Sequence, residues 1–180
     1  MKVTLLTDVD LCIGCYTCET ACKQEHDLPT GVRLMRVIQV GPEEVGGRLV
    51  MDFVPMRCRH CENPPCMAVC PVDAITKRPD GIVLYDQEIC IGCKRCIEAC
   101  PFGAAQYNPE TERAQACDLC YHRVDQGLVP ACVYHCPTGA LVFNEPAAFT
   151  ETKRAQQAEG YLQRRFPDGP DSLQTEQGEA

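Results

Sequence analysis

The sequence predicts an α+β fold built from small, internally repeated units, and three observations favour this class. The 180 residues include sixteen cysteines, which fall into four sets of four with closely similar spacing. Short segments rich in β-branched residues lie before and after these sets, as expected for short strands. Aromatic residues make up 6% of the chain and tryptophan is absent, so ordinary side chains cannot fill a large apolar core.

The spacing of the cysteines is typical of iron–sulfur cluster ligands. Two sets have the pattern C-x2-C-x2-C-x3-C, and the other two stretch the middle gap to four and to eleven residues. In such patterns three close thiolates bind one cubane cluster, while the fourth cysteine binds a different one. We therefore expect the chain to conduct electrons. The sets are Cys12, Cys15, Cys18 and Cys22; Cys58, Cys61, Cys66 and Cys70; Cys90, Cys93, Cys96 and Cys100; and Cys117, Cys120, Cys132 and Cys136.

Disulfide bonds and structural zinc are the alternative explanations of these cysteines. Small disulfide-rich proteins are secreted, and the segment Met1–Cys12 lacks the basic stretch, apolar core and cleavage site of a secretory signal. Structural zinc uses well-separated cysteine pairs around one tetrahedral ion, whereas a C-x2-C-x2-C triplet places three sulfurs in one tight loop. We expect iron–sulfur clusters and keep zinc as the alternative to be excluded by experiment.

Composition and charge exclude several classes of function. The formal net charge is −8, and bound clusters with their thiolates would bring it to roughly −16, which disfavours nucleic-acid binding. No apolar run is long enough to span a bilayer, so we expect no direct membrane insertion. With so few large apolar residues, the chain without its clusters should be largely unfolded.

Internal repeats indicate ferredoxin-like units. The segment Asp8–Cys15 is echoed by Asp86–Cys93, and both carry glycine two residues after their first cysteine. At Gly14 and Gly92 the missing Cβ should let backbone amides approach sulfur. The last cysteine of three sets is followed by proline, which turns the chain away from the cluster, whereas Cys22 is followed by lysine.

The remaining elements can be assigned in order along the chain. We expect strands at Val3–Leu6, Ile82–Tyr85 and Leu141–Phe143. A β-hairpin is expected from Arg33–Val40 and Arg48–Val54, with its turn between Gly41 and Gly47, and a second turn at Asn108–Glu110. A polar helix should cover Glu151–Arg165, followed by an extended tail.

Two motifs make the sequence resemble a known family, the four-cluster iron–sulfur subunits of dimethyl sulfoxide reductase type. The motifs are CRHCENPPC at residues 58–66, and CDLC at 117–120 followed by Gly127, Pro130-Ala131-Cys132 and Cys136-Pro137. The resemblance extends from about Val9 to Phe143. This family also serves polysulfide, thiosulfate and formate enzymes and some tungsten aldehyde oxidoreductases.

The resemblance implies a nested arrangement of two ferredoxin-like units, each holding two 4Fe-4S clusters. The outer unit would comprise residues 1–32 and 108–144, and the inner unit residues 56–107. Residues 33–55 would be the hairpin insertion, and 145–180 a polar C-terminal helix and docking tail. We name the implied ligand groups site 1 (Cys12, Cys15, Cys18, Cys136), site 2 (Cys117, Cys120, Cys132, Cys22), site 3 (Cys58, Cys61, Cys66, Cys100) and site 4 (Cys90, Cys93, Cys96, Cys70).

We expect four complete clusters, because this chain has all four cysteines of the third set. Some relatives lack one of these cysteines and carry a three-iron cluster there. Positive residues of the inner sets, among them Arg57, Arg59 and Lys94, should make the inner clusters the first to be reduced. No catalytic residues and no Gly-rich dinucleotide loop are recognised, so the chain should not be an enzyme by itself. The histidines are expected to lie on the surface or around the ligands: His26, His60, His122 and His135.

The expected function is that of an electron-transfer subunit, which connects a large molybdenum- or tungsten-pterin subunit with a second redox partner. That second partner would be a soluble flavin subunit or a quinone-reactive membrane anchor. A free polyferredoxin serving several oxidoreductases is the alternative. The absence of a recognisable targeting segment favours the cytoplasm, although family members can be carried across the inner membrane by a partner with a twin-arginine signal.

Overall fold

The chain divides into two compact units, Met1–Phe143 and Asn144–Ala180. The computed structural model describes residues 2–165. In the described residues the strands form four two-stranded sheets, β1–β8, β2–β3, β4–β5 and β6–β7. Helices and strands are thus mixed along the chain, in agreement with the α+β class.

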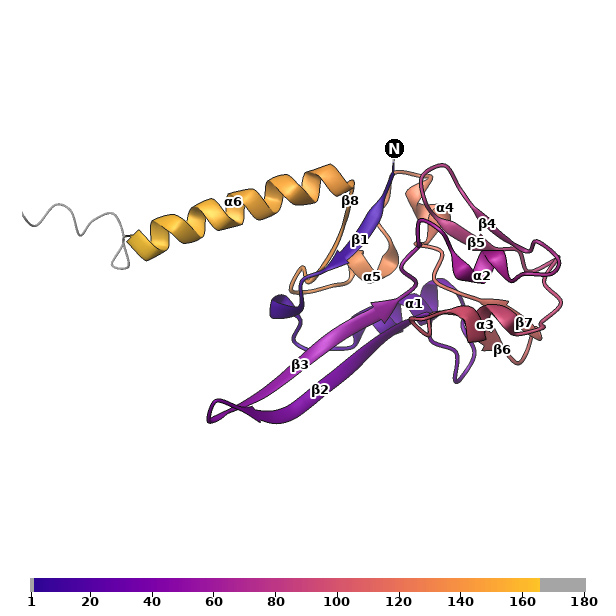
Figure 1. The fold of residues 1–180 in the computed structure, drawn as a ribbon, viewed down its shortest axis with the longest axis horizontal. Helices are drawn as coiled ribbons and strands as arrows, with labels where there is room; N and C mark the ends of the chain where they lie inside the picture. Colours follow the sequence, from indigo (N-terminus) through magenta and orange to yellow (C-terminus); the bar gives the residue numbers. More distant parts are fainter. Residues whose placement is uncertain (1, 166–180) are drawn as a thin grey trace, which may run out of the picture. The chain divides into compact units, whose positions relative to one another are not determined.

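The two ends of the first unit pair with each other. Strand β1 (Thr4–Thr7) lies beside β8 (Leu141–Asn144), as Figure 1 shows. A short 3-10 helix, η1 (Val9–Leu11), follows β1 and is capped by Asp8, whose carboxylate accepts a hydrogen bond from the N–H of Asp10 at 3.2 Å. The pairing of β1 with β8 brings the first and fourth cysteine sets to the same end of the unit.

A long antiparallel hairpin separates the first two cysteine sets. Its strands are β2 (Met35–Val45) and β3 (Arg48–Arg57). The turn is formed by Gly46 and Gly47, whereas the expected start of the turn, at Gly41, lies within β2 as a shift of register between Val40 and Glu43. Gly41 has a φ of +93° and the following Pro42 has no N–H, so this dipeptide makes a bulge and the strands continue beyond it.

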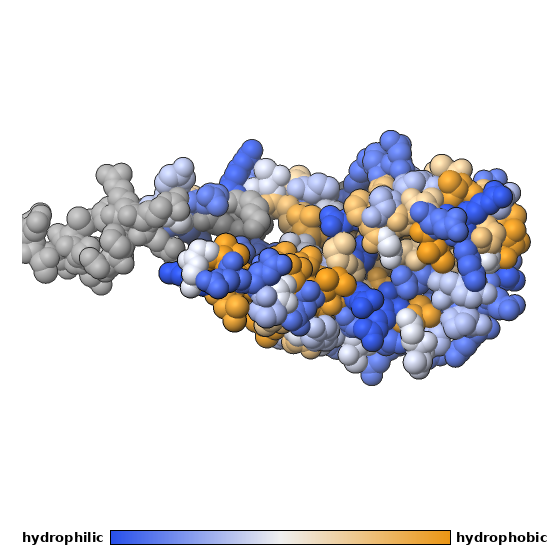
Figure 2. Space-filling view, turned by 60° about the horizontal axis from the view of Figure 1, so that its bottom comes forward, coloured by the Kyte–Doolittle hydropathy of each residue, from blue (hydrophilic) through white to orange (hydrophobic). Residues whose placement is uncertain are grey.

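The hairpin exposes many apolar side chains. Leu49 is 77% exposed and Val45 60%, and the surface over this ribbon contains the apolar area visible in Figure 2. Strands normally bury one face, so this exposure of apolar side chains on a hairpin is unusual. Further exposed apolar residues of the hairpin are Ile38, Val40, Val50 and Met51.

Very short elements make up the rest of the first unit. Strand β4 (Ile75–Lys77) pairs with β5 (Val83–Tyr85), and β6 (Gln106–Asn108) pairs with β7 (Arg113–Gln115). These pairs connect the second set to the third and the third set to the fourth. The helices are α1 (Thr17–Glu25), α2 (Pro65–Ala68), α3 (Arg95–Ala99), α4 (Tyr121–Val124) and α5 (Ala131–Tyr134).

Thiols and aliphatic side chains share two cores. The larger core combines cysteines of the first and fourth sets with residues such as Leu5, Leu34 and Leu141. The smaller core combines cysteines of the second and third sets with Ile75 and Val83. Side chains of adjacent strand residues point to opposite faces, so β5 contributes to both cores: Val83 lies in the smaller core, and the partly buried Leu84 packs against the larger one.

The second unit contains one long helix. Helix α6 (Pro146–Arg165) begins at Pro146 and not near Glu151 as expected. Proline is well accommodated in the first turn of a helix, and the two residues that follow it are alanines, which favour helix. Glu151 and Arg154 form an ion pair at 2.7 Å along its surface. The expected tail from residue 166 onward lies outside the described residues.

Candidate metal centres

The ligand loops of the first and third sets share one backbone conformation. Gly14 and Tyr16 have φ angles of +66° and +59°, and Gly92 and Lys94 have +66° and +65°. Left-handed residues placed in this way point successive N–H groups toward one side of the loop, where they favour anionic sulfur. The N–H of Gly92 accordingly donates to the Sγ atom of Cys90 at 3.4 Å.

Both glycines are also required by close packing. A Cβ atom at Gly14 would lie 2.5 Å from the ring of Phe53, and one at Gly92 would collide with the carbonyl oxygen of Glu112. The sequence explained these glycines by the approach of amides to sulfur. The structure adds a second reason for glycine at both positions, namely the close contact of the loops with the hairpin and with the turn after β6.

Short helices present the third cysteine of each set. Cys18 and Cys96 lie in the first turns of α1 and α3, directly after the left-handed residues, whereas Cys66 and Cys132 lie in α2 and α5 after a proline. All four are buried. The two kinds of loop therefore deliver an equivalent sulfur to the interior from different sequence patterns.

Two cavities are lined by sulfurs from different sets. In one, Cys136 of the fourth set faces three cysteines of the first set, beside Val37 and Leu141. In the other, Cys70 of the second set faces three cysteines of the third set, beside Ile75 and Tyr85. The lining sulfurs are Cys12, Cys15, Cys18 and Cys136 in the first cavity and Cys70, Cys90, Cys93 and Cys96 in the second.

The other eight cysteines also form two groups of neighbours. Burial, assisted by the nearby thiolates of Cys66, Cys100 and Cys61, raises the pKa of Cys58 to about 11. Burial, together with the thiolates of Cys120 and Cys22, likewise raises the pKa of Cys132 to about 12. The two groups are Cys58, Cys61, Cys66 and Cys100, and Cys22, Cys117, Cys120 and Cys132.

These four groups have the chemistry that a 4Fe-4S cluster requires. Each offers four thiols and buries at least one of them, and the group of Cys22, Cys117, Cys120 and Cys132 buries all four. Burial disfavours the ionised form of a thiol unless a cation is bound. Iron supplies that cation, and ligand binding releases the protons. The residues present therefore fit one cubane cluster per group.

The groups also follow one another in space. Burial is the main cause of the raised pKa of Cys96, Cys117 and Cys132, and in each case a thiolate from another group adds to it. Such Coulombic effects require short separations, so each pair marks two adjacent groups. The linking pairs are Cys18 and Cys132, Cys117 and Cys58, and Cys96 and Cys66.

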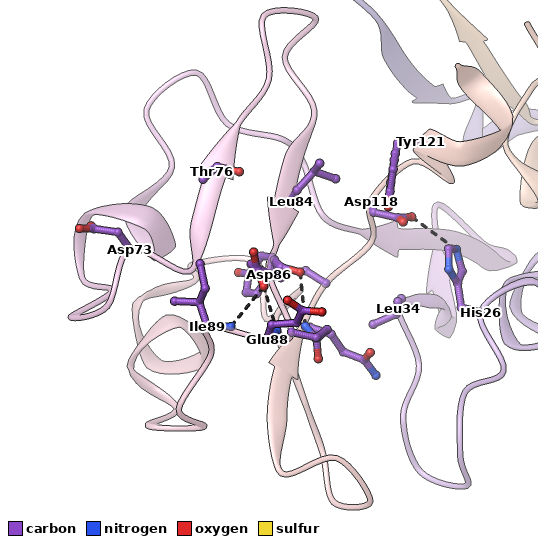
Figure 3. A pocket seen from close by; sticks show the side chains of 14 residues that line it. His26, Leu34, Asp73, Thr76, Leu84, Asp86, Glu88, Ile89, Asp118 and Tyr121 are labelled. Carbon is purple, nitrogen blue, oxygen red and sulfur yellow. Dashed lines mark hydrogen bonds and ion pairs between the residues drawn. The ribbon is translucent and has the colours of Figure 1, made fainter. Parts of the chain in front are cut away.

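Two histidines engage partners around the fourth set. His26 Nε2 lies 3.4 Å from a carboxylate oxygen of Asp118, as Figure 3 shows, and also 3.4 Å from the sulfur of Cys120. These three residues are close enough to hold a metal ion together, yet Cys120 already belongs to a group of four thiols. His122 contacts Glu25 at 2.7 Å.

The remaining two histidines differ in their surroundings. Nδ1 of His60 accepts a hydrogen bond from the N–H of Val83 at 2.9 Å, and burial lowers the pKa of this ring to about 4. His135 has an edge-to-face contact with Tyr134.

The positive residues of the inner sets do not share one location. Lys94 lies over the ring of Tyr107 at 3.9 Å and Arg59 over that of Phe102 at 5.2 Å. Arg57, by contrast, is buried, and the cysteines that most favour its charge belong to the fourth set. The assignment of Arg57 to the inner sets alone is therefore incomplete, because the end of β3 carries it between sets.

Tyr85 is a residue near the ligands that sequence reasoning recognised only as a strand residue. Burial raises the pKa of its hydroxyl, and a hydrogen bond with Cys66 and the nearby thiolate of Cys96 act in the same direction. No spacing rule in the sequence points to this contact, because it depends on the pairing of β5 with β4.

Comparison with known proteins identifies the family. A 4Fe-4S dicluster domain matches residues 49–146, and a second 4Fe-4S dicluster domain matches residues 11–74. A thiosulfate reductase electron transfer subunit of Salmonella typhi is 40% identical over 174 residues, which cover 96% of this chain and 91% of that protein. The protein belongs to the 4Fe-4S dicluster family of reductase iron–sulfur subunits.

Subunits of other reductases show a similar degree of identity to this family member. A tetrathionate reductase subunit of Salmonella typhimurium is 41% identical over 145 residues, covering 80% of this chain. The chain spans 58% of the length of that relative. A polysulfide reductase subunit of Wolinella succinogenes is 39% identical over 146 residues, covering 80% of this chain and 76% of that protein.

Family membership accounts for the cysteine content of this iron–sulfur subunit. The two dicluster matches imply four 4Fe-4S clusters, for which the sixteen cysteines suffice, and the relative from Salmonella typhi is named as an electron transfer subunit. Among residues 2–165, no helix is long and apolar enough to cross a membrane.

Proposed function

We propose that this subunit relays electrons through its four clusters between a molybdenum- or tungsten-pterin catalytic subunit and a second redox partner. The observation that carries the proposal is the succession of four cysteine groups, each adjacent to the next. When bound, each 4Fe-4S cluster accepts and releases one electron. The protein's contribution is to hold the groups in series within a single unit.

The proposed ligand sets are those of sites 1 to 4. The cavity at which Cys136 meets the first set supports site 1, and the cavity at which Cys70 meets the third set supports site 4. Neighbouring thiolates contribute to the raised pKa values of Cys132 and Cys58, which supports sites 2 and 3 respectively. In this assignment every site takes its fourth cysteine from another set, as in two-cluster ferredoxins.

The nested arrangement of the units belongs to the same proposal. Pairing of β1 with β8 supports an outer unit of residues 1–32 and 108–144, and pairing of β4 with β5 supports an inner unit of residues 56–107. The hairpin of residues 33–55 is then an insertion between them. Residues 145–180 form the proposed docking extension.

The exposed surface of the hairpin and the names of the relatives together support the proposed partner proteins. The exposed apolar ribbon of the hairpin suits burial against a large subunit. The names of the relatives describe them as subunits of tetrathionate, thiosulfate and polysulfide reductases, which supports a pterin-containing partner for this chain. We propose either a soluble flavin subunit or a quinone-reactive membrane anchor as the second partner, and a cytoplasmic location, with export alongside a twin-arginine partner as the alternative.

Purification of the protein from its native host under anaerobic conditions tests this function. The proposal predicts a brown complex in which a large subunit containing molybdenum or tungsten accompanies the chain in a one-to-one ratio. A brown protein that purifies alone and reduces several oxidoreductases would establish a free polyferredoxin instead. A colourless protein containing zinc would contradict both.

A further inference from the structure

Arg57 occupies an unusual position at the end of β3. It is 8% exposed, and its Nε atom has no hydrogen-bond partner. No carboxylate among residues 2–165 forms an ion pair with it, and the cavity that it lines contains Arg33 and Arg36 but no acidic residue. A buried guanidinium with neither a counter-charge nor a full set of acceptors is costly unless an anionic group compensates it.

Three neighbours place this cation between site 2 and site 3. Arg57 directly precedes Cys58, a ligand of site 3. Across the hairpin it pairs with Met35, whose backbone N–H donates to the sulfur of Cys22, a ligand of site 2. The two sites are adjacent here, because the charge of the Cys58 thiolate contributes to the raised pKa of Cys117.

Charge effects agree with this placement. Burial lowers the pKa of Arg57, whereas the thiolates of Cys117 and Cys132, both ligands of site 2, act to raise it, and Cys58 of site 3 does the same. The pKa of an arginine begins so high that the group stays protonated at this depth. A permanent positive charge therefore faces two groups of thiolates at the middle of the series.

We propose that Arg57 raises the reduction potentials of the clusters at sites 2 and 3 together. In this way it supports electron transfer between the outer and the inner unit. This inference rests on the proposed function and its ligand assignment. A reduced cluster carries one more negative charge than an oxidised cluster, so the cation stabilises the reduced form. The orphaned Nε–H would be free to donate to a sulfur of a bound cluster, which would act in the same direction.

The position of Arg57 matters because electrons must pass from one ferredoxin-like unit to the other between sites 2 and 3. A cluster of low potential on either side of this junction would be a barrier to transfer. One cation shared by both sites raises the two potentials in parallel and keeps them matched. Arg59, two residues away, is exposed and stacks on Phe102, so it cannot act in the same way.

Redox titration followed by EPR tests the inference on the purified iron-loaded protein. The variants are Arg57→Gln and, as the matched control of equal charge change, Arg59→Gln. Signals of the two end sites are assigned beforehand with Cys136→Ser and Cys70→Ser. We expect Arg57→Gln to reduce the equilibrium constant for reduction of both middle clusters by at least about tenfold, which equals a fall of about 59 mV. Arg59→Gln should shift them far less.

Unchanged middle potentials in an Arg57→Gln protein with wild-type iron content would overturn the inference, as would an equal shift in Arg59→Gln. If Arg57→Gln does not retain its iron, Arg57→Met, which fills the space without a polar group, takes its place in the titration. Loss of iron from both, but not from Arg57→Lys, would show that the cation holds the clusters and does not tune them, and would also overturn the inference. A wild-type protein without four clusters would instead refute the proposed function.

Discussion

Arg78 and Asp125 form a two-point ion pair between segments that lie far apart in the sequence. The guanidinium donates to both carboxylate oxygens, at 2.9 and 2.6 Å. Arg78 follows β4, between the second and third cysteine sets, whereas Asp125 follows α4 in the fourth set. The pair therefore fastens the proposed inner unit to the outer one.

The Asp125→Asn variant should be less stable than the wild type at pH 7, and the difference should shrink in high salt because both groups are partly exposed. Arg78 holds the pKa of Asp125 below its ordinary value of 3.8. The unfolded state therefore takes up protons at higher pH than the folded state does. Stability from this pair is present above pH 3.8 and is lost as the pH falls through the lowered folded value.

Thermal unfolding under anaerobic conditions, followed by cluster absorbance, measures this effect. Glu44→Gln, an exposed charge change on the hairpin, is the control. A salt-independent difference, or an equal loss in the control, would show that the ion pair does not join the units.

Glu19 provides the corresponding link between α1 and the hairpin. Its buried carboxylate accepts a hydrogen bond from the N–H of Val37 at 2.6 Å and contacts Arg33 at 3.4 Å. Glu19→Ala leaves a buried N–H without an acceptor, so we expect a loss of about 1–3 kcal/mol in unfolding free energy. Denaturant titration by circular dichroism checks this against Glu44→Ala. A loss no larger than that of the control would contradict it.

Exchange of ligands between sets predicts an effect at a distance in sequence. Cys136 belongs to the fourth set but lines the cavity of the first. The Cys136→Ser variant should therefore alter the cluster bound by Cys12, Cys15 and Cys18. Cys132→Ser, the comparison within the same set, should alter the cluster at site 2. EPR and Mössbauer spectra distinguish the two, and a Cys136→Ser protein perturbed at site 2 would show that the nested assignment is wrong.

Truncation after Glu145 tests the role of the C-terminal extension. The first compact unit ends at Phe143, so removal of the rest should leave all clusters in place, with about sixteen irons per chain. The extension carries few large apolar residues, which suits an arm that docks on a partner. Complex formation should weaken on truncation, as measured by co-purification of the large subunit. The residues concerned are Phe149, Tyr161, Leu162 and Phe166.

Control proteins for the truncation keep the helix and change its exposed ring. Tyr161 is 70% exposed, so Tyr161→Ala should retain its iron and reduce assembly in part. Loss of iron on truncation, or unchanged assembly, would count against a docking function for the extension.

The cofactor could be predicted from the sequence because cluster chemistry fixes the spacing of its ligands. A loop that wraps three sulfurs around one cube allows few residues between Cys12, Cys15 and Cys18, and that pattern is readable without a fold. Runs of β-branched residues likewise predicted the strands of the hairpin. Its turn was placed too early because the pair Gly41-Pro42 is as typical of a bulge as of a turn.

Other features depend on tertiary packing and left no trace in the sequence. Strands β4, β6 and β7 have three residues each, too few to show a period of two. The position of Arg57 between two sites follows from the length and register of β3, and the contact of Tyr85 with Cys66 follows from the pairing of β5. From its position in the sequence Arg57 was therefore assigned to the second cysteine set, whereas packing places it against the fourth set as well.

The most direct test of the central claim is the number and type of clusters in the fully loaded protein. Iron and sulfide analysis combined with Mössbauer spectroscopy and EPR spin integration after full reduction should give about sixteen irons and about four spins per chain. Neighbouring clusters in a series should also broaden each other's EPR signals by magnetic interaction. A three-iron signal in the oxidised protein, a lower iron content with zinc, or four clusters without mutual interaction would contradict the account.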